Sequence, residues 1–214
     1  MEKAFWQQRW QEGKIGFHEG APNRHLSEHF DALGQMPGAH VFVPLCGKAV
    51  DLDWLLARGL RVSGAEINVD AVEAVFDRFE VTPDITQYSA LVRYSKGNLT
   101  LWAGDLFELT ADDLGSVDAV YDRAALVALP PQMRTAYVTH LRRLCPQVPR
   151  LLVTYDYDQS QMDGPPFSVP ENEIRSLFED GFSIEHLASV PISGPLAERC
   201  SGKEHAWLLQ PPGS

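Results

Sequence analysis

Three short segments of the sequence carry residue types that suit a nucleoside-containing cofactor. In the loop 45–48, Gly47 lets the backbone approach a ligand closely because it has no Cβ. Glu66 follows Gly47 by 19 positions, and an acid at about this spacing is well placed to accept hydrogen bonds from ribose hydroxyls. Asp105, in the segment 104–106, could reach the edge of an adenine or a ribose. Their combination predicts a site for a nucleoside cofactor.

The glycine pattern narrows the choice of cofactor. Taken singly, Gly47 also suits an ordinary strand-to-helix turn, and Glu66 also suits a solvated turn. The second and third glycines of G-x-G-x-x-G, on which a dinucleotide places its pyrophosphate, are missing here. This favours a cofactor without a pyrophosphate, of which S-adenosylmethionine is the common one. Two alternatives stay open at this stage: an NAD-dependent oxidoreductase and a catalytically silent nucleoside-binding module.

Strands that alternate with helices position these segments. Such alternation predicts a parallel α/β sheet, and ligands of open α/β sheets bind beyond the carboxyl ends of the strands. The last two strands lack a helix between them, so we expect an antiparallel hairpin at that edge. The predicted strands are 40–45, 61–66, 91–95, 99–103, 117–121, 151–155, 182–190 and 204–209, and the predicted helices are 2–12, 22–33, 49–58, 69–80, 132–144 and 171–178.

Length and composition favour one globular domain over residues 1–214, with 44% hydrophobic and 22% charged residues. The net charge of −11 disfavours nucleic acid and anionic membrane surfaces as partners. Cys46, Cys145 and Cys200 are odd in number and far apart, which disfavours a disulfide framework and suits a reducing compartment. We find no signal peptide and no apolar run of the roughly 18–20 residues that a spanning helix needs. These features predict a cytoplasmic protein, and the absence of a heptad pattern favours a monomer.

Two other patterns are set aside. Residues 25–29 match H-x-x-E-H, a zinc-peptidase pattern that places two histidines on one face of a helix. The pattern is short and no further ligand can be identified from the sequence, so no metal is expected. Cys46 lies beside the proposed cofactor loop without an evident activating base, and we interpret it as a packing residue.

Four segments together resemble the thiopurine S-methyltransferase family in its bacterial form. They are FWQQRWQEGKIGFHEG, VFVPLCGKAVDLDWLLARGLRVSGAEI, VYDRAALVALPPQMR and GPPFSVPENEIRSLF, spread from residue 5 to residue 178. The resemblance implies a Rossmann-like class I methyltransferase fold, with a seven-stranded, mostly parallel sheet, an antiparallel C-terminal edge hairpin and helices on both faces. It also implies S-adenosylmethionine as the methyl donor and an N-terminal helical lid over residues 1–35.

The resemblance assigns roles to residues before the middle of the chain. Trp10 and Phe17 match the N-terminal segment that closes over the cofactor, and Phe17 also lies near the acceptor. Leu45 matches the cofactor-contacting residue of the PLCGK loop, and Glu66 matches the ribose-binding acid.

Four further residues receive roles in the same way. Asp105 and Leu106 fall where the family contacts the adenine. Arg123 matches the arginine of the DRAAL motif, near both cofactor and acceptor, and is the predicted catalytic residue. Arg199 corresponds to a substrate-pocket arginine, in a segment that departs from the family pattern by a shortened stretch before the last strand.

The implied reaction is in-line displacement of S-adenosylhomocysteine from the sulfonium methyl by a thiol or thiolate. Alignment of the reacting atoms can contribute up to roughly 7–11 kcal/mol in ideal cases. Heteroaromatic thiols are more acidic than alkyl thiols, so transfer could proceed without a dedicated general base, and the sequence leaves the use of one open. Arg123 would stabilise the thiolate or bind the cofactor carboxylate, whereas its purely structural alternative is a buried pairing with Asp122 or another acid. Selenium or tellurium compounds are further acceptors that the resemblance suggests.

Overall fold

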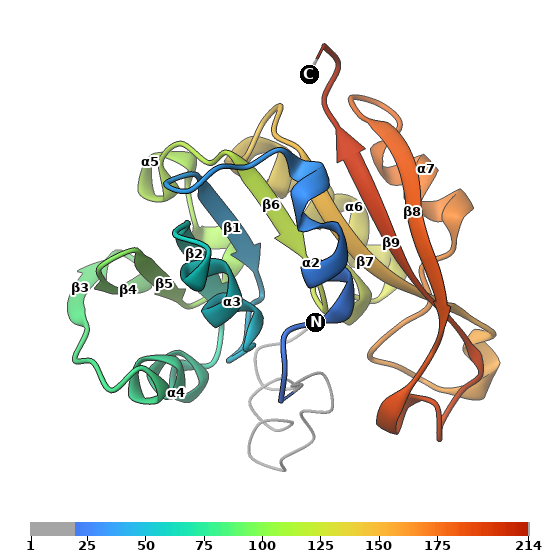
Figure 1. Cartoon of the computed structure of the whole chain (residues 1–214), viewed down its shortest axis with the longest axis horizontal. Coiled ribbons are helices and arrows are strands. Elements are labelled where there is room, and N and C mark those ends of the chain that lie inside the picture. The colour runs from blue at the N-terminus through green and yellow to red at the C-terminus, as the bar shows by residue number, and fades with distance from the viewer. Residues whose placement is uncertain (1–19, 214) are drawn as a thin grey trace.

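A computed structural model describes residues 20–213, and its centre is one nine-stranded sheet (Figure 1). The strand order is β3-β4-β5-β2-β1-β6-β7-β9-β8. The strands β5, β2, β1, β6 and β7 run parallel, whereas the pairs at both edges are antiparallel. The strands are β1 (His40–Pro44), β2 (Arg61–Glu66), β3 (Asp84–Tyr88), β4 (Leu91–Lys96), β5 (Leu99–Ala103), β6 (Ala119–Asp122), β7 (Arg150–Tyr157), β8 (Ser183–Pro191) and β9 (Gly202–Gln210).

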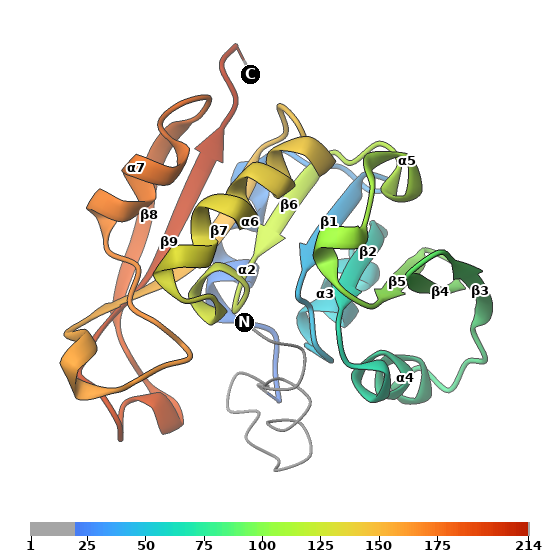
Figure 2. The same ribbon diagram turned by 180° about the vertical axis from the view of Figure 1, so that it is seen from behind.

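Helices cover both faces of this sheet. Figure 1 shows α2, α3 and α4 in front of it, and Figure 2 shows α5, α6 and α7 on the other face. The α-helices are α2 (Arg24–His29), α3 (Asp51–Ala57), α4 (Val69–Arg78), α5 (Ala111–Leu114), α6 (Pro131–Leu144) and α7 (Glu171–Phe178). The 3-10 helices are η1 (Phe30–Leu33), η2 (Leu106–Glu108), η3 (Leu126–Ala128), η4 (Gln159–Gln161) and η5 (Gly194–Leu196). Among the helices of residues 20–213, none combines the length and the apolar character needed to cross a bilayer.

The two faces bury separate hydrophobic clusters, because successive side chains of a strand point to opposite faces. Every residue of β1 is buried. Val41 and Val43 pack with Leu52 of α3 on one face, whereas Phe42 packs with Tyr137 of α6 on the other. A strand buried on both faces is typical of the parallel centre of an α/β sheet.

The structure confirms the predicted fold class. The seven-stranded unit is β5-β2-β1-β6-β7-β9-β8, with β8 and β9 forming the expected antiparallel hairpin. The turn at Gly97 joins β4 to β5, also as predicted. β3 was not predicted, because its residues are mostly exposed and lack an alternating apolar pattern. β3 and β4 therefore extend the seven-stranded unit beyond β5.

The N-terminal part of the chain is described only from residue 20 onward. The predicted helix 22–33 is α2 followed by the 3-10 turn η1, and it ends at Gly34 with a left-handed φ of 67°. Leu26, Phe30 and Leu33 are buried in the cluster under α3. The predicted helix 2–12 and most of the predicted lid lie outside the described residues, so the lid stays a prediction.

Candidate active site

The loop after β1 makes a tight backbone turn at the carboxyl edge of the sheet. Leu45 and Gly47 both adopt left-handed backbone angles, with φ of 47° and 52°. The N–H of Cys46 donates to the carbonyl of Ala65 at 3.0 Å, which holds the loop against the end of β2. Gly47 therefore occupies a conformation that favours glycine, and its backbone lies at the edge where cofactors of this architecture bind.

A glycine that the sequence analysis did not single out allows this close packing. A Cβ on Gly64 of β2 would lie 2.6 Å from Cys46 Sγ and 2.8 Å from a side-chain carbon of Leu101. Cys46 is buried, and burial holds the pKa of its thiol well above the ordinary value. The contact agrees with the interpretation of Cys46 as a packing residue.

Glu66 joins the loop after β1 to the loop after β2. Its Oε2 accepts the N–H of Gly47 at 2.9 Å, and its Oε1 accepts the N–H of Asn68 at 2.8 Å. The side chain is only 6% exposed, which excludes a solvated turn residue. Burial raises its pKa to about 7, although the backbone donors oppose the shift. Because a carboxylate offers about four acceptor positions, its backbone donors leave room for a hydroxyl donor.

The third predicted segment lies beside Glu66. The N–H of Gly104 donates to the Glu66 carbonyl at 2.9 Å, and Gly104 has a φ of 142°. Asp105 is exposed, and its carboxylate accepts the N–H of Phe107 at 3.0 Å. Leu106 is buried, and its carbonyl lies 2.8 Å from His140 Nε2. The three predicted segments thus meet at the carboxyl ends of adjacent strands.

Arg123 lies next to this group, directly after β6. It is 7% exposed, and its Nη1 lies 3.9 Å from Oδ2 of the buried Asp51 at the start of α3. The Tyr121 hydroxyl donates to the same carboxylate oxygen at 3.1 Å, and the N–H of Asn23 donates to the other oxygen at 2.7 Å. A narrow cavity here is lined by Val43, Leu45, Cys46, Lys48, Ala49, Asp51, Tyr121, Arg123 and Ala124.

Asp122 was considered above as a buried partner of Arg123, but its carboxylate bonds to other groups. Its carboxylate accepts the Tyr137 hydroxyl at 2.8 Å and the N–H of Leu126 at 3.1 Å. The acid beside Arg123 is therefore Asp51, which precedes it by 72 positions and carried no signal in the sequence.

Another arginine, which the sequence analysis missed, anchors the loop 164–170 to the segment that follows Arg123. Arg134 of α6 is buried and binds both carboxylate oxygens of Glu173 at 2.6 and 2.7 Å. It also donates to the carbonyls of Leu129 and Ser168 at 3.0 and 3.1 Å. These contacts hold the segment after Arg123 and the loop 164–170 together.

The last three predicted site residues are Arg199, Trp10 and Phe17. Arg199 is exposed and lies between η5 and β9. Because β8 runs in the same direction as β7, this connection lies at the same end of the sheet as the loop after β1. Trp10 and Phe17 lie outside the described residues.

Comparisons with known proteins agree with one another. A family model described as Thiopurine S-methyltransferase matches residues 1–207. The chain is 49% identical over 211 residues to the thiopurine S-methyltransferase of Xanthobacter autotrophicus, covering 98% of this chain and 99% of that protein. It is 44% identical over 207 residues to the corresponding protein of Gluconobacter oxydans, covering 97% and 94%.

Solved structures support the same fold. The magnesium protoporphyrin IX methyltransferase of Synechocystis, solved with bound SAM, aligns with a TM-score of 0.63, 19% identity and 96% coverage of both chains. A Burkholderia thailandensis 1,6-didemethyltoxoflavin N1-methyltransferase, solved with its substrate and S-adenosylhomocysteine, aligns with a TM-score of 0.68 and 16% identity. That alignment covers 98% of this chain and 87% of the other. At these identities the likeness shows the fold alone.

Proposed function

The chain belongs to the thiopurine S-methyltransferase family, and on that premise we propose how its own residues serve an S-adenosylmethionine-dependent methyl transfer to a thiol. Family membership decides against the NAD-dependent oxidoreductase and the silent nucleoside-binding module. The observation that carries the site assignment is the convergence of Gly47 and Gly104 on Glu66, to which each donates a backbone hydrogen bond at the carboxyl edge of the sheet.

The cofactor would lie across this edge. Glu66 fits a ribose diol, because it is held in place by backbone N–H groups and still has room for a hydroxyl donor. Leu45 and Gly47 would line the methionine part with backbone, and Asp105 and Leu106 would border the adenine. Trp10 would close over the site from the N-terminal segment. When bound, S-adenosylmethionine supplies an electrophilic methyl group that needs no further activation.

Arg123 would act on the acceptor side. Asp51 and the groups around it hold the Arg123 guanidinium at the edge of the cavity, where it can stabilise a thiolate or bind the cofactor carboxylate. The acceptor sulfur would take the methyl group as its bond to the donor sulfur breaks, with S-adenosylhomocysteine as the leaving group and the thiol proton passing to solvent. The chain's contribution is alignment, water exclusion and charge stabilisation.

We also propose which acceptor the protein methylates, and its domain organisation, oligomeric state and compartment. The substrate class is an aromatic or heterocyclic thiol such as a thiopurine, with Phe17 and Arg199 bordering it, and selenium or tellurium compounds are further candidates. We propose a single domain over residues 1–214, with residues 1–35 as a lid, acting as a monomer in the cytoplasm. Three free, buried cysteines support a reducing compartment.

The test is transfer of labelled methyl from S-adenosylmethionine to 6-mercaptopurine. We expect saturable transfer by the native protein and about a 100-fold lower kcat in Arg123→Gln, as for the loss of one preorganised charge-stabilising donor. Arg175→Gln is the matched control, because Arg175 is a half-exposed arginine of α7 that pairs only locally, with Glu171. An Arg123→Gln protein with native kcat and native KM values for both substrates would remove Arg123 from the mechanism.

A further inference from the structure

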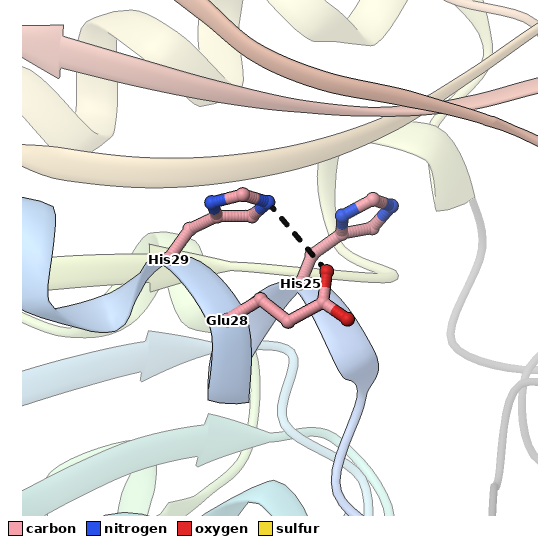
Figure 3. A group of neighbouring side chains, drawn as sticks. All are labelled: His25, Glu28 and His29. Carbon is pink, nitrogen blue, oxygen red and sulfur yellow. Dashed lines mark ion pairs between the residues drawn. The ribbon is translucent and has the colours of Figure 1, made fainter.

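One face of α2 gathers three potential metal ligands. His25, Glu28 and His29 each offer a donor atom, and these atoms lie within 4.8 Å of one another (Figure 3). The spacing of three and four residues places all three side chains on the same side of a helix. The His25 and His29 rings are stacked, with their centroids 5.8 Å apart. The arrangement presents two imidazoles and one carboxylate to a common point.

A carboxylate on another element lies beside His25. Its side chain is fully buried, and its Nε2 lies 3.6 Å from Oε2 of Glu204 on β9. In Figure 3 one ring nitrogen of His25 turns toward Glu28 and His29, and the other turns away from them. Because Nε2 faces Glu204, the nitrogen left for the cluster is Nδ1. A carboxylate beside the distal nitrogen is a common outer partner of a metal-binding imidazole, although at 3.6 Å Glu204 is not hydrogen-bonded to His25.

Three ring nitrogens of the cluster lack a hydrogen-bond partner within residues 20–213. They are the buried atoms His25 Nδ1, His25 Nε2 and His29 Nε2. The nearest carboxylate oxygen to His29 Nε2 is on Glu28, at 3.9 Å. Buried polar atoms are nearly always satisfied in folded proteins, so the two nitrogens that face the cluster, His25 Nδ1 and His29 Nε2, indicate an occupant that accepts both lone pairs.

We propose that His25, Glu28 and His29 form a binding site for a divalent transition-metal cation such as zinc. Two imidazole nitrogens and one carboxylate oxygen are a zinc donor set, and three protein ligands leave a fourth position open. Ligand atoms about 2.1 Å from a tetrahedral ion lie about 3.4 Å apart. Glu28 is half-exposed, so its side chain can rotate to close the remaining separation.

This site departs from the expectation that the chain holds no metal. The sequence expectation rested on the shortness of the motif and on the lack of an identifiable further ligand. Residues 20–213 supply no further ligand, but β9 places the Glu204 carboxylate beside His25 although the two residues are 179 positions apart in the chain.

A second histidine pair provides a matched control. His186 of β8 and His205 of β9 lie on neighbouring strands, with Nε2 of the first 2.9 Å from Nδ1 of the second. These two nitrogens are already hydrogen-bonded to each other, unlike those of His25 and His29. A variant of His186 therefore removes a histidine without touching the proposed ligands.

The experiment is a titration of metal-free, full-length protein with Co²⁺, followed by visible absorption and calorimetry. We expect one saturable equivalent with the d–d bands of a low-coordinate site, displacement by Zn²⁺, and a rise in Tm on binding. His29→Gln should weaken binding by at least about tenfold, and Glu28→Gln by about tenfold, whereas His186→Gln should leave it unchanged. Both altered ligands are partly exposed, which favours folding of the variants.

Three results would overturn the proposal. They are the absence of saturable Co²⁺ binding to the native protein, unchanged affinity in folded His29→Gln and Glu28→Gln, and loss of binding in His186→Gln. Far-UV circular dichroism identifies folded variants, and Glu28→Gln decides the matter if His29→Gln does not fold.

Discussion

The raised pKa of Glu66 predicts that cofactor affinity and protein stability respond to pH in opposite directions. Burial raises this pKa from an ordinary value of 4.5 to about 7. A ribose diol needs the ionised carboxylate as acceptor, so below pH 7 binding must release a proton. For a pKa of about 7, the affinity for S-adenosylhomocysteine should fall about tenfold between pH 8 and pH 6, and about 30-fold by pH 5.5.

Stability of the ligand-free protein should change the other way. Between pH 4.5 and pH 7 the folded state keeps a proton on Glu66 that the unfolded state has released. The stabilisation that this bound proton gives the folded state is therefore fully present below pH 4.5 and is lost as the pH rises through about 7. A change in pKa from 4.5 to about 7 corresponds to about 3 kcal/mol of the free energy of unfolding.

Calorimetric titration with S-adenosylhomocysteine from pH 5.5 to pH 8.5, with urea unfolding over the same range, measures both effects. Glu66→Gln has no charge to titrate and should flatten both curves, whereas Glu185→Gln, an exposed acid on β8, should leave both as in the native protein. Burial holds the pKa of the neighbouring Cys46 thiol well above its ordinary value, so Cys46 stays neutral in this range. An affinity independent of pH in the native protein, or a pH dependence that survives Glu66→Gln, would refute the reasoning.

Two further predictions concern the elements that hold the site. Gly104→Ala should lower the free energy of unfolding by about 3 kcal/mol, because φ is 142° and the new Cβ would lie 2.5 Å from a side-chain carbon of Leu91. Gly34→Ala, in the left-handed helical region at φ 67° and with nothing within 4 Å of the new Cβ, should lower it by only about 1 kcal/mol, and equal losses in urea unfolding would contradict this account. Arg134→Met should lower the free energy of unfolding by about 3 kcal/mol, because Arg134 is buried and bonded to a carboxylate and two carbonyls. Arg175 is half-exposed, so Arg175→Met should lower the free energy of unfolding by less than about 1 kcal/mol. A drop in Tm as large as that of Arg134→Met would disprove this difference between the buried and the exposed arginine.

Most elements could be predicted because their sequences carry strong local patterns. β2 (Arg61–Glu66) and α7 (Glu171–Phe178) match the predicted bounds at both ends, and α6 starts one residue earlier than predicted. β3 could not be predicted, because an exposed edge strand is held by pairing with β4 rather than by an apolar pattern of its own.

The sequence by itself determined which residues meet at the proposed cofactor edge. Helices between parallel strands bring the carboxyl ends together, so the positions of Gly47, Glu66 and Asp105 after successive strands were enough to group them. Chemistry that depends on residues far apart in the chain was decided only by the tertiary structure. Asp51 faces Arg123, and Glu204 faces His25, because sheet pairing and helix packing bring them into contact. Burial, which shifts the pKa of Glu66, likewise exists only in the folded chain, since desolvation requires atoms from several elements at once.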